Sequence, residues 1–167
     1  MAVWGREKRR RQNKGKRKAM EIKHTKELHK DFEKLNCMLD DAYYERFGEI
    51  ALKYRPYNTL EGIEDFFIAY DQEKPVACGC FRKITDKTAE LKRVYVLPDY
   101  RRRGIANELV GNCEAAAREQ SFKYMRLETG VEMLEAIQMY QKRKFIIIEN
   151  YEEFAGDEIC CCMEKEL

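Results

Sequence analysis

The sequence has no long hydrophobic segment. None of its apolar runs approaches the roughly 20 residues needed to cross a bilayer, so we expect no association with a membrane. The N-terminus has the positive charge of a secretory signal but lacks the apolar segment that must follow it. We therefore expect a cytoplasmic protein.

Linkers and internal repeats are also missing. No stretch rich in proline, glycine or serine divides the 167 residues. A chain of this length, 44% hydrophobic and 37% charged, can bury one core without disulfides or metal ions. The composition predicts one folded domain over residues 20–167, preceded by a basic tail over residues 1–19.

Histidine is scarce, with two residues in the chain and none near the cysteine run Cys160–Cys162. Successive residues of a strand point to opposite faces, so these three thiols cannot all face one site. Zinc sites need converging cysteine and histidine ligands, and we expect no bound metal. The seven cysteines, an odd number, are predicted to be reduced thiols in or near the core.

Positive charge is concentrated at the N-terminus. Residues 1–18 hold nine Lys/Arg and one Glu, a charge of +8, while the rest holds 23 Lys/Arg and 29 Asp/Glu, a charge of −6. Such a one-sign block is not expected to fold. Two interpretations stay open: contact with nucleic acid or the ribosome through phosphates, or a dispensable extension before Met20.

The first half of the domain alternates between helical and strand patterns. Residues 21–47 predict an amphipathic helix, and a second helical segment is interrupted or ended by Pro56. Residues 59–71 predict a short helix and the entry to a strand. Residues 74–84 and 88–98 predict two strands joined by a hairpin turn. The apolar positions of the first helix are Leu28, Phe32, Leu35, Leu39 and Tyr43.

The second half alternates strands and helices. Helices are predicted over 105–120 and 131–144, on either side of a strand over 123–130, and the chain closes with strands over 145–151 and 158–166. Helices, then strands, then a strand–helix repeat predict a mixed α/β sheet with helices on both faces.

A strand-to-helix turn carries the main functional signal. In "VYVLPDYRRRGIANELV" (94–110), three arginines and Gly104 separate a strand from a helix. Glycine adopts backbone geometries that other residues resist, and the helix directs its free N–H groups and dipole into the turn. These features predict a pyrophosphate-sized anion site, although a solvated basic turn explains the same residues. The Walker and three-glycine dinucleotide patterns are both missing.

Residues 90–151 resemble the GNAT superfamily of acetyl-CoA-dependent N-acetyltransferases. Arg101–Ala106 matches its phosphate-loop pattern, Arg/Gln-x-x-Gly-x-Gly/Ala, and about thirty residues later Ala136, Tyr140 and Phe145 match a second motif. The "RLETG" strand and the "CMEKEL" ending are similar to a branch of small bacterial proteins with unassigned substrates. The resemblance implies a mostly antiparallel sheet of about six to seven strands.

The same resemblance implies acetyl-CoA as cofactor. In the family, the strand before the phosphate loop splays from its neighbour, and its free backbone groups hold the pantetheine arm. The loop and the first turn of the next helix receive the pyrophosphate. The residues implied to contact the cofactor are Val94, Tyr95, Val96, Arg101, Arg102, Arg103, Gly104, Ile105, Ala106 and Asn107.

The chain departs from the family at two positions. Met133 stands where an asparagine often helps to hold the cofactor, and Lys144 replaces the glycine that usually precedes the final aromatic residue. Met133 cannot make the asparagine's hydrogen bond. Lys144 implies that the helix must end without a residue that easily adopts a left-handed conformation.

The resemblance also suggests catalytic residues. Tyr140 is the expected general acid: the reference pKa values of phenol and thiol make proton transfer to the thiolate uphill by only about 2 kcal/mol. Glu90 is the expected base, with Glu128 as its competitor. Either glutamate is alternatively an edge carboxylate paired with Lys92 or Arg126.

The acceptor is expected to contact the early helices through Tyr43, Tyr44, Arg55 and Tyr57. An arginine among tyrosines suits a carboxylate, which favours an amino acid or similar small amine. Two other functions stay open: an acetyltransferase for a peptide or ribosomal protein, with the tail on RNA, and a catalytically silent acetyl-CoA-binding module. The oligomeric state is left between monomer and homodimer.

Overall fold

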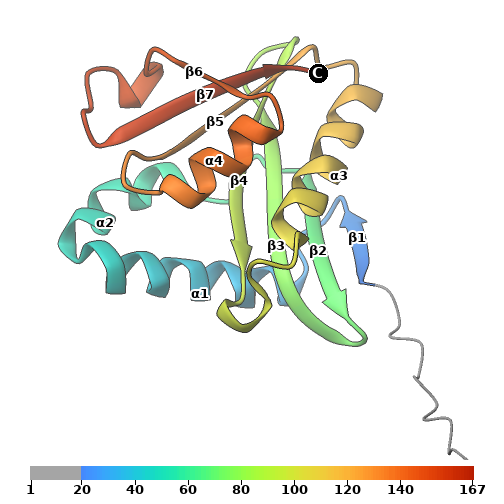
Figure 1. Ribbon diagram of the computed structural model, residues 1–167. Coiled ribbons are helices and arrows are strands. Elements are labelled where there is room, and N and C mark those ends of the chain that lie inside the picture. The colour runs from blue at the N-terminus through green and yellow to red at the C-terminus, as the bar shows by residue number, and fades with distance from the viewer. Residues whose placement is uncertain (1–19) are drawn as a thin grey trace, which may run out of the picture.

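The computed structural model describes residues 20–167 (Figure 1). The predicted tail, residues 1–19, lies outside the described residues. The domain is built on a seven-stranded sheet with the order β1-β2-β3-β4-β5-β7-β6, in which only β4 and β5 pair in parallel. The mixed, mostly antiparallel sheet predicted from the sequence is thereby confirmed.

The elements follow the sequence patterns closely from β2 onward. The strands are β1 (Glu21–Thr25), β2 (Asp65–Asp71), β3 (Lys74–Lys83), β4 (Thr88–Val96), β5 (Tyr124–Gly130), β6 (Ile146–Ile148) and β7 (Cys160–Glu166). The α-helices are α1 (Lys30–Phe47), α2 (Glu49–Tyr54), α3 (Ile105–Glu119) and α4 (Leu134–Lys142). Short 3-10 turns occupy η1 (Arg55–Asn58), η2 (Pro98–Tyr100) and η3 (Glu152–Phe154).

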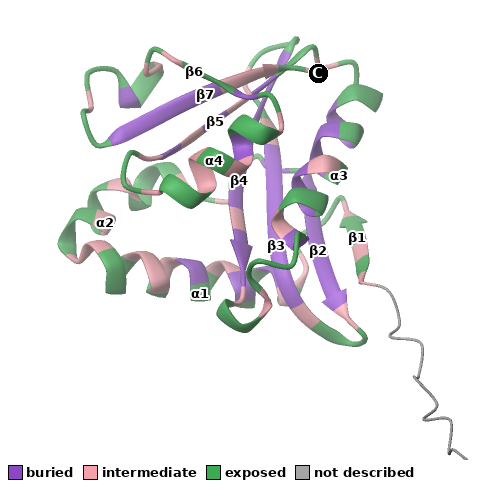
Figure 2. Cartoon of the chain, viewed as in Figure 1, coloured by how far each residue is buried: buried purple, intermediate pink, exposed green. Residues whose placement is uncertain are grey.

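Helices cover both faces of the sheet, and each face has its own core (Figures 1 and 2). Along β2, Phe67 and Ala69 join the core beneath α3, while Phe66 and Ile68 join the core beneath α1. This alternation is the two-residue period of a strand that is buried on both sides. The sheet is therefore a central layer, and its strand ends are free to form a site.

The cysteines behave as their spacing predicts. All seven are unpaired, and all but Cys37 are buried. Cys160 and Cys162 pack with Phe154 on one face of β7, whereas Cys161 belongs to the core beneath α3. The three thiols thus point to two faces, as expected. None of the helices in residues 20–167 is long and apolar enough to cross a membrane.

The predicted helix over residues 21–47 is wrong at its start. Residues 21–25 form β1, which pairs antiparallel with β2, and α1 begins only at Lys30. The ring of His24 stacks on Phe67 at 4.3 Å and its Nε2 lies 2.7 Å from Asp65, contacts that local helical spacing does not reveal. Leu28, counted as apolar helix face, is 42% exposed.

The short helix expected within residues 59–71 is also not formed. The described chain makes a turn at residues 61–62, where Gly62 has a φ of 72°, and then enters β2 directly. A left-handed glycine ends local helical geometry. The rest of this segment is strand, as predicted.

The end of α4 has no residue that easily adopts a left-handed conformation, as expected from Lys144. Lys144 itself adopts the left-handed conformation, with a φ of 74°. Its amide donates to Gln141 at 2.9 Å, and the amide of Phe145 donates to Tyr140 at 3.0 Å. This is the usual glycine-type helix termination, so the lysine carries a backbone strain that a glycine would avoid.

Candidate active site

The site begins where β4 and β5 separate. The two strands pair only at three positions, Thr88–Glu90 with Tyr124–Arg126, although β4 continues to Val96 and β5 to Gly130. Beyond these pairs the facing backbone edges lose their sheet partners. Unpaired backbone groups at a strand edge bind another extended chain or a ligand.

The backbone of β4 turns N–H groups toward this opening. The amide of Leu97 donates to the carbonyl of Val76 on β3 at 2.9 Å. Backbone groups alternate in direction along a strand, so the amides of Val94 and Val96 face away from β3. The amide of Tyr95 faces β3, so it does not point into the opening between β4 and β5.

A bulge at Arg93 accompanies the separation. The register between β3 and β4 shifts between Cys78 and Cys80, and Arg93 has a φ of 58°. Its guanidinium donates to the side chain and carbonyl of Asn36 and to the carboxylate of Asp40, both on α1. These bonds attach α1 to the bulge, and bulges re-aim strands beside functional sites.

The predicted phosphate loop combines a left-handed glycine with an uncapped helix start. Gly104, with a φ of 80°, precedes α3 and gives the helix no side-chain cap. Arg102 is also left-handed, with a φ of 61°. The side chain of Ile105 is buried in the core, that of Ala106 is half-buried and that of Asn107 is exposed. A ligand therefore reaches these residues through backbone amides at the positive end of the helix dipole.

The three arginines differ in their contacts. Arg101 donates from Nε to the carbonyl of Val96 at 3.0 Å, and Arg103 donates from Nη2 to the carbonyl of Asp99 at 2.7 Å. Arg102 is exposed. Two of the three thus brace the backbone of their own loop, while all three place positive charge around it.

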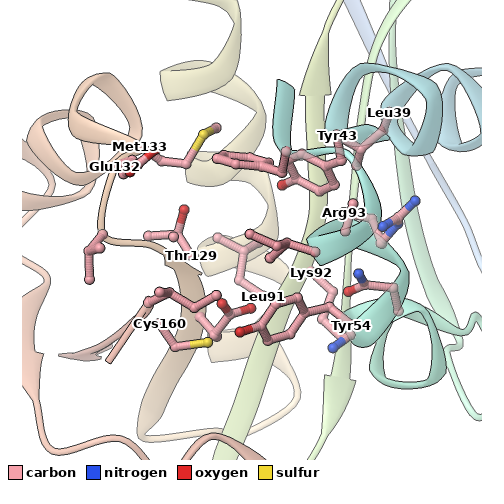
Figure 3. Close-up of a pocket in the computed structure, with 18 of the residues that line it drawn as sticks. Leu39, Tyr43, Tyr54, Leu91, Lys92, Arg93, Thr129, Glu132, Met133 and Cys160 are labelled. Atoms are coloured by element: carbon pink, nitrogen blue, oxygen red, sulfur yellow. The ribbon is translucent and has the colours of Figure 1, made fainter. Parts of the chain in front are cut away.

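A cavity of about 190 Å³ lies at the separation of the strands (Figure 3). Its walls come from α1, α2, η1, β4, β5 and β7 and from the loops that contain residues 131–133 and 159. Tyr43 from α1, Tyr54 from α2, Lys92 from β4, Thr129 from β5 and Cys160 from β7 surround it, as Figure 3 shows. The cavity therefore adjoins the part of β4 that leads to the free amides.

The residues predicted to contact the acceptor are only partly brought together. Tyr43 lines the cavity. Tyr44 is 52% exposed and Arg55 is exposed, and neither lines it. Tyr57 borders a neighbouring, shallower hollow. The sequence pattern assigns these four residues to one segment, but it does not show which side chains face the opening.

Tyr140 lies on α4, is 7% exposed and packs edge-to-face on Phe145 at 5.6 Å. Burial raises the pKa of Tyr140, and Tyr43 and Glu128 raise that pKa further. Its hydroxyl has no hydrogen-bond partner within residues 20–167. The one fully buried side-chain nitrogen or oxygen there without a partner is Nη1 of Arg93, so the Tyr140 hydroxyl keeps contact with solvent. Tyr140 does not itself line the cavity, but two residues that do, Tyr43 and Glu128, are close enough to raise its pKa.

Glu90 is held by three partners. It is 1% exposed, and its Oε2 accepts from Nε of Arg82 at 2.6 Å and lies 3.6 Å from Nζ of Lys92. Its Oε1 accepts from the hydroxyl of Tyr151 at 3.2 Å. Both carboxylate oxygens are therefore engaged in a buried charged network. Glu90 lines the cavity with both of its oxygens already bonded.

Glu128 has a different environment. Burial raises its pKa, an effect that the thiol of Cys160 and the charge of Lys92 only partly offset. No ion pair joins it to a lysine or arginine of residues 20–167. It lines the same cavity as Glu90. Glu128 is half-buried. A partly desolvated carboxylate with a raised pKa and no ion pair is typical of a proton acceptor.

A set of hydrogen bonds centred on Asp157, here called the latch, lies beside the cavity and was not predicted from the sequence. Asp157, in the segment before β7, accepts from Nζ of Lys53 at 2.8 Å and from the hydroxyl of Tyr54 at 2.7 Å. It also accepts from the amide of Ile159 at 3.2 Å. The latch joins α2 to a segment about a hundred residues later, and no local pattern signals such a contact.

Comparisons with known proteins agree with this architecture. The model of the Acetyltransferase (GNAT) family matches residues 32–145. An uncharacterized N-acetyltransferase of Chlorobaculum tepidum is 35% identical over 71 residues, which cover 42% of this chain and 46% of that protein. The chain spans about half the length of the curated relatives it matches.

Solved structures show the same fold. A proposed acyl-CoA N-acyltransferase from Klebsiella pneumoniae has a TM-score of 0.73 at 24% identity, over 89% of this chain and 97% of that one. A GNAT acetyltransferase from Elizabethkingia anophelis, solved with acetyl-CoA bound, has a TM-score of 0.65 at 18% identity, over 89% and 98% of the two chains. By the family match over most of its domain, the chain belongs to the GNAT family of acetyltransferases.

Proposed function

We propose that the protein transfers the acetyl group of acetyl-CoA to a primary amine of a small molecule, by direct attack within a ternary complex. The observation that carries the proposal is the separation of β4 from β5, which joins an edge of free amides to a cavity containing carboxylates. The Elizabethkingia relative binds acetyl-CoA, and its similar fold supports the same cofactor here.

The loop at Gly104 fits the pyrophosphate of such a cofactor. A Cβ added to Gly104 would meet no atom within 4 Å, so the backbone there is open to a ligand. Amides at a helix start bind phosphate groups. The backbone from Arg102 to Asn107 would hold the pyrophosphate, and the amides of Val94 and Val96 would hold the pantetheine arm. Bound acetyl-CoA supplies an acetyl group activated as a thioester.

The chain supplies three functions to the transfer. Glu128 accepts the proton that the attacking amine loses, directly or through water. An amide of β4 donates to the acetyl oxygen and stabilises its developing charge. As the new C–N bond forms and the C–S bond breaks, the hydroxyl of Tyr140 supplies a proton to the leaving sulfur. The raised pKa of Tyr140 keeps that proton in place before the reaction.

Glu128 replaces Glu90 as the base in this proposal. Both oxygens of Glu90 already accept hydrogen bonds, from Arg82 and Tyr151, whereas Glu128 forms no ion pair with a lysine or arginine of residues 20–167. Glu90 then has a positioning role, because it fixes Lys92 at the cavity wall.

Acetyl-CoA-dependent thiol release with a panel of primary amines tests the proposal. Saturable release with small amines supports it. Cofactor binding without release for any amine indicates a silent binding module, and release with peptides alone indicates a protein acceptor. A chain beginning at Met20 is expected to keep full activity. Loss of activity in that chain, with nucleic-acid binding that weakens steeply with salt, would favour an acceptor on the ribosome.

A further inference from the structure

We propose that the acceptor is a monoamine with an apolar body, an alkylamine or arylalkylamine whose cationic nitrogen approaches Glu128. This inference rests on the proposed function and names its substrate class. It follows from three properties of the cavity: its mainly apolar walls, the ion pairs that its charged residues form, and its volume.

The walls of the cavity are mainly apolar. They include the side chains of Leu39, Phe47, Ile50, Val131, Met133 and Ile159. Ile50, Val131 and Ile159 are 54%, 40% and 42% exposed, so apolar side chains continue outward to the mouth. Exposed apolar residues that cluster around an opening are typical of a binding site for an apolar group.

The cavity has one shielded carboxylate without an ion-pair partner. Glu90 is paired with Arg82 and Lys92, and Glu132 is solvent-exposed, so water screens its charge. Glu128 is half-buried, and within residues 20–167 no lysine or arginine forms an ion pair with it. One unpaired negative charge matches one ammonium group, whereas a polyamine would place its further cations against apolar walls.

The cavity offers no cation for the carboxylate of an amino acid. Lys92 is paired with Glu90, and the guanidinium of Arg93 is bonded to Asn36 and Asp40. The remaining nitrogen of Arg93, Nη1, is fully buried. The carboxylate of such an acceptor would therefore share the cavity with Glu128, with no cation to balance its charge. Two like charges held close together repel strongly. The expectation that Arg55 binds a carboxylate finds no support, because Arg55 does not line the cavity.

The volume of the cavity suits a small apolar group. It measures about 190 Å³, and an engineered apolar cavity of about 150 Å³ in another protein accommodates benzene. One ring or a branched alkyl chain therefore fits with its ammonium group attached. A larger polar acceptor, such as an aminoglycoside, would extend beyond the cavity.

Matched acceptors test the inference. Phenylalanine differs from phenethylamine only by an added carboxylate. We expect kcat/KM for phenethylamine to be higher by about tenfold or more, because an unbalanced negative charge in the cavity weakens acceptor binding by at least that factor. Spermidine is expected to be poorer by a similar factor. Higher activity with phenylalanine, spermidine or a peptide N-terminus would overturn the inference while leaving the acetyltransferase function intact.

Substitution at the mouth tests the apolar contact. Val131→Ser is expected to weaken phenethylamine binding in the presence of coenzyme A, measured by calorimetry, without affecting coenzyme A itself. Leu134→Ser is the matched control, because Leu134 is 63% exposed on the next helix and does not line the cavity. Equal binding in both variants would overturn the inference. Phenethylamine binding without thiol release for any amine would instead contradict the proposed function.

Discussion

Arg82 donates from Nε to Oε2 of Glu90 at 2.6 Å, and this partly buried pair lies beside the cavity that also contains Glu128. The two glutamates are on neighbouring strands but have opposite environments. Glu90 is fully engaged, whereas burial raises the pKa of Glu128. The difference separates a structural carboxylate from a candidate base.

Glu128→Gln is expected to lower kcat/KM by about a hundredfold or more, the usual contribution of a general base. In the wild type, kcat/KM should rise with pH as Glu128 loses its proton. Because its pKa is raised, this rise lies above the range of an ordinary glutamate. Steady-state rates across pH measure both effects. Glu128→Gln should lose this rise of kcat/KM with pH.

Glu90→Gln is the matched comparison. It should disturb the contacts of Arg82 and Lys92 but keep the rise with pH that Glu128 produces. If instead the rise disappears in Glu90→Gln and persists in Glu128→Gln, the assignment of the base is reversed.

Tyr140→Phe is expected to reduce kcat about tenfold or more with little change in acetyl-CoA affinity, because only the proton donor is removed. The ring packing on Phe145 is retained. Tyr124→Phe is the control, since Tyr124 is 36% exposed on β5 and has no role in the proposed transfer. Unchanged turnover in Tyr140→Phe would remove this hydroxyl from the mechanism.

Glu114 should make the fold sensitive to acid. This carboxylate is 2% exposed and accepts from Arg143 at 2.8 Å and Lys165 at 2.7 Å. Burial by itself raises its pKa, but the two cations outweigh burial and lower it. The unfolded chain therefore takes up this proton at higher pH than the folded chain. The stabilisation is complete above the unfolded pKa and is lost as pH falls through the folded pKa.

Glu114→Gln is therefore expected to lower the free energy of unfolding at pH 7 by about 3 kcal/mol, because it leaves buried cations uncompensated. Its denaturant midpoint should also depend less on pH in the acid range. Glu119→Gln, on the exposed end of the same helix, should change little. Equal stability losses in the two variants would contradict this role for Glu114.

Lys144→Gly is expected to stabilise the fold. Lys144 has a φ of 74° at the end of α4, and relief of a left-handed non-glycine residue gains about 1 kcal/mol. Thermal unfolding should show a Tm higher by about 3 °C. Lys144→Ala should give no such gain, because alanine has the same steric conflict. A gain with alanine would attribute the effect to loss of the lysine side chain.

Much of the fold was predictable because its patterns are local. Residues 105–119 show helical periodicity, and the strands around the turn before residue 88 have β-branched and apolar runs. The anion-site geometry at Gly104 also follows from adjacent residues. Local pattern failed for β1, whose conformation depends on pairing with β2, a strand forty residues later.

The cavity was less predictable, because distant segments assemble it. Tyr54 meets Asp157 across 103 positions of sequence, and Arg93 meets Asn36 across 57. Neither contact is indicated by the spacing or the composition of the residues in the sequence. The distinction between Glu90 and Glu128 likewise depends on Arg82, which faces Glu90 only because β3 and β4 pair in a particular register.

Calorimetric titration of coenzyme A into the purified protein tests the central claim most directly. The account predicts saturable binding at one site. It also predicts that Gly104→Val weakens this binding by about tenfold or more, because a β-branched side chain opposes the left-handed backbone and obstructs the loop amides. Absence of coenzyme A binding to the folded wild-type chain, or equal affinity in Gly104→Val, would contradict the account.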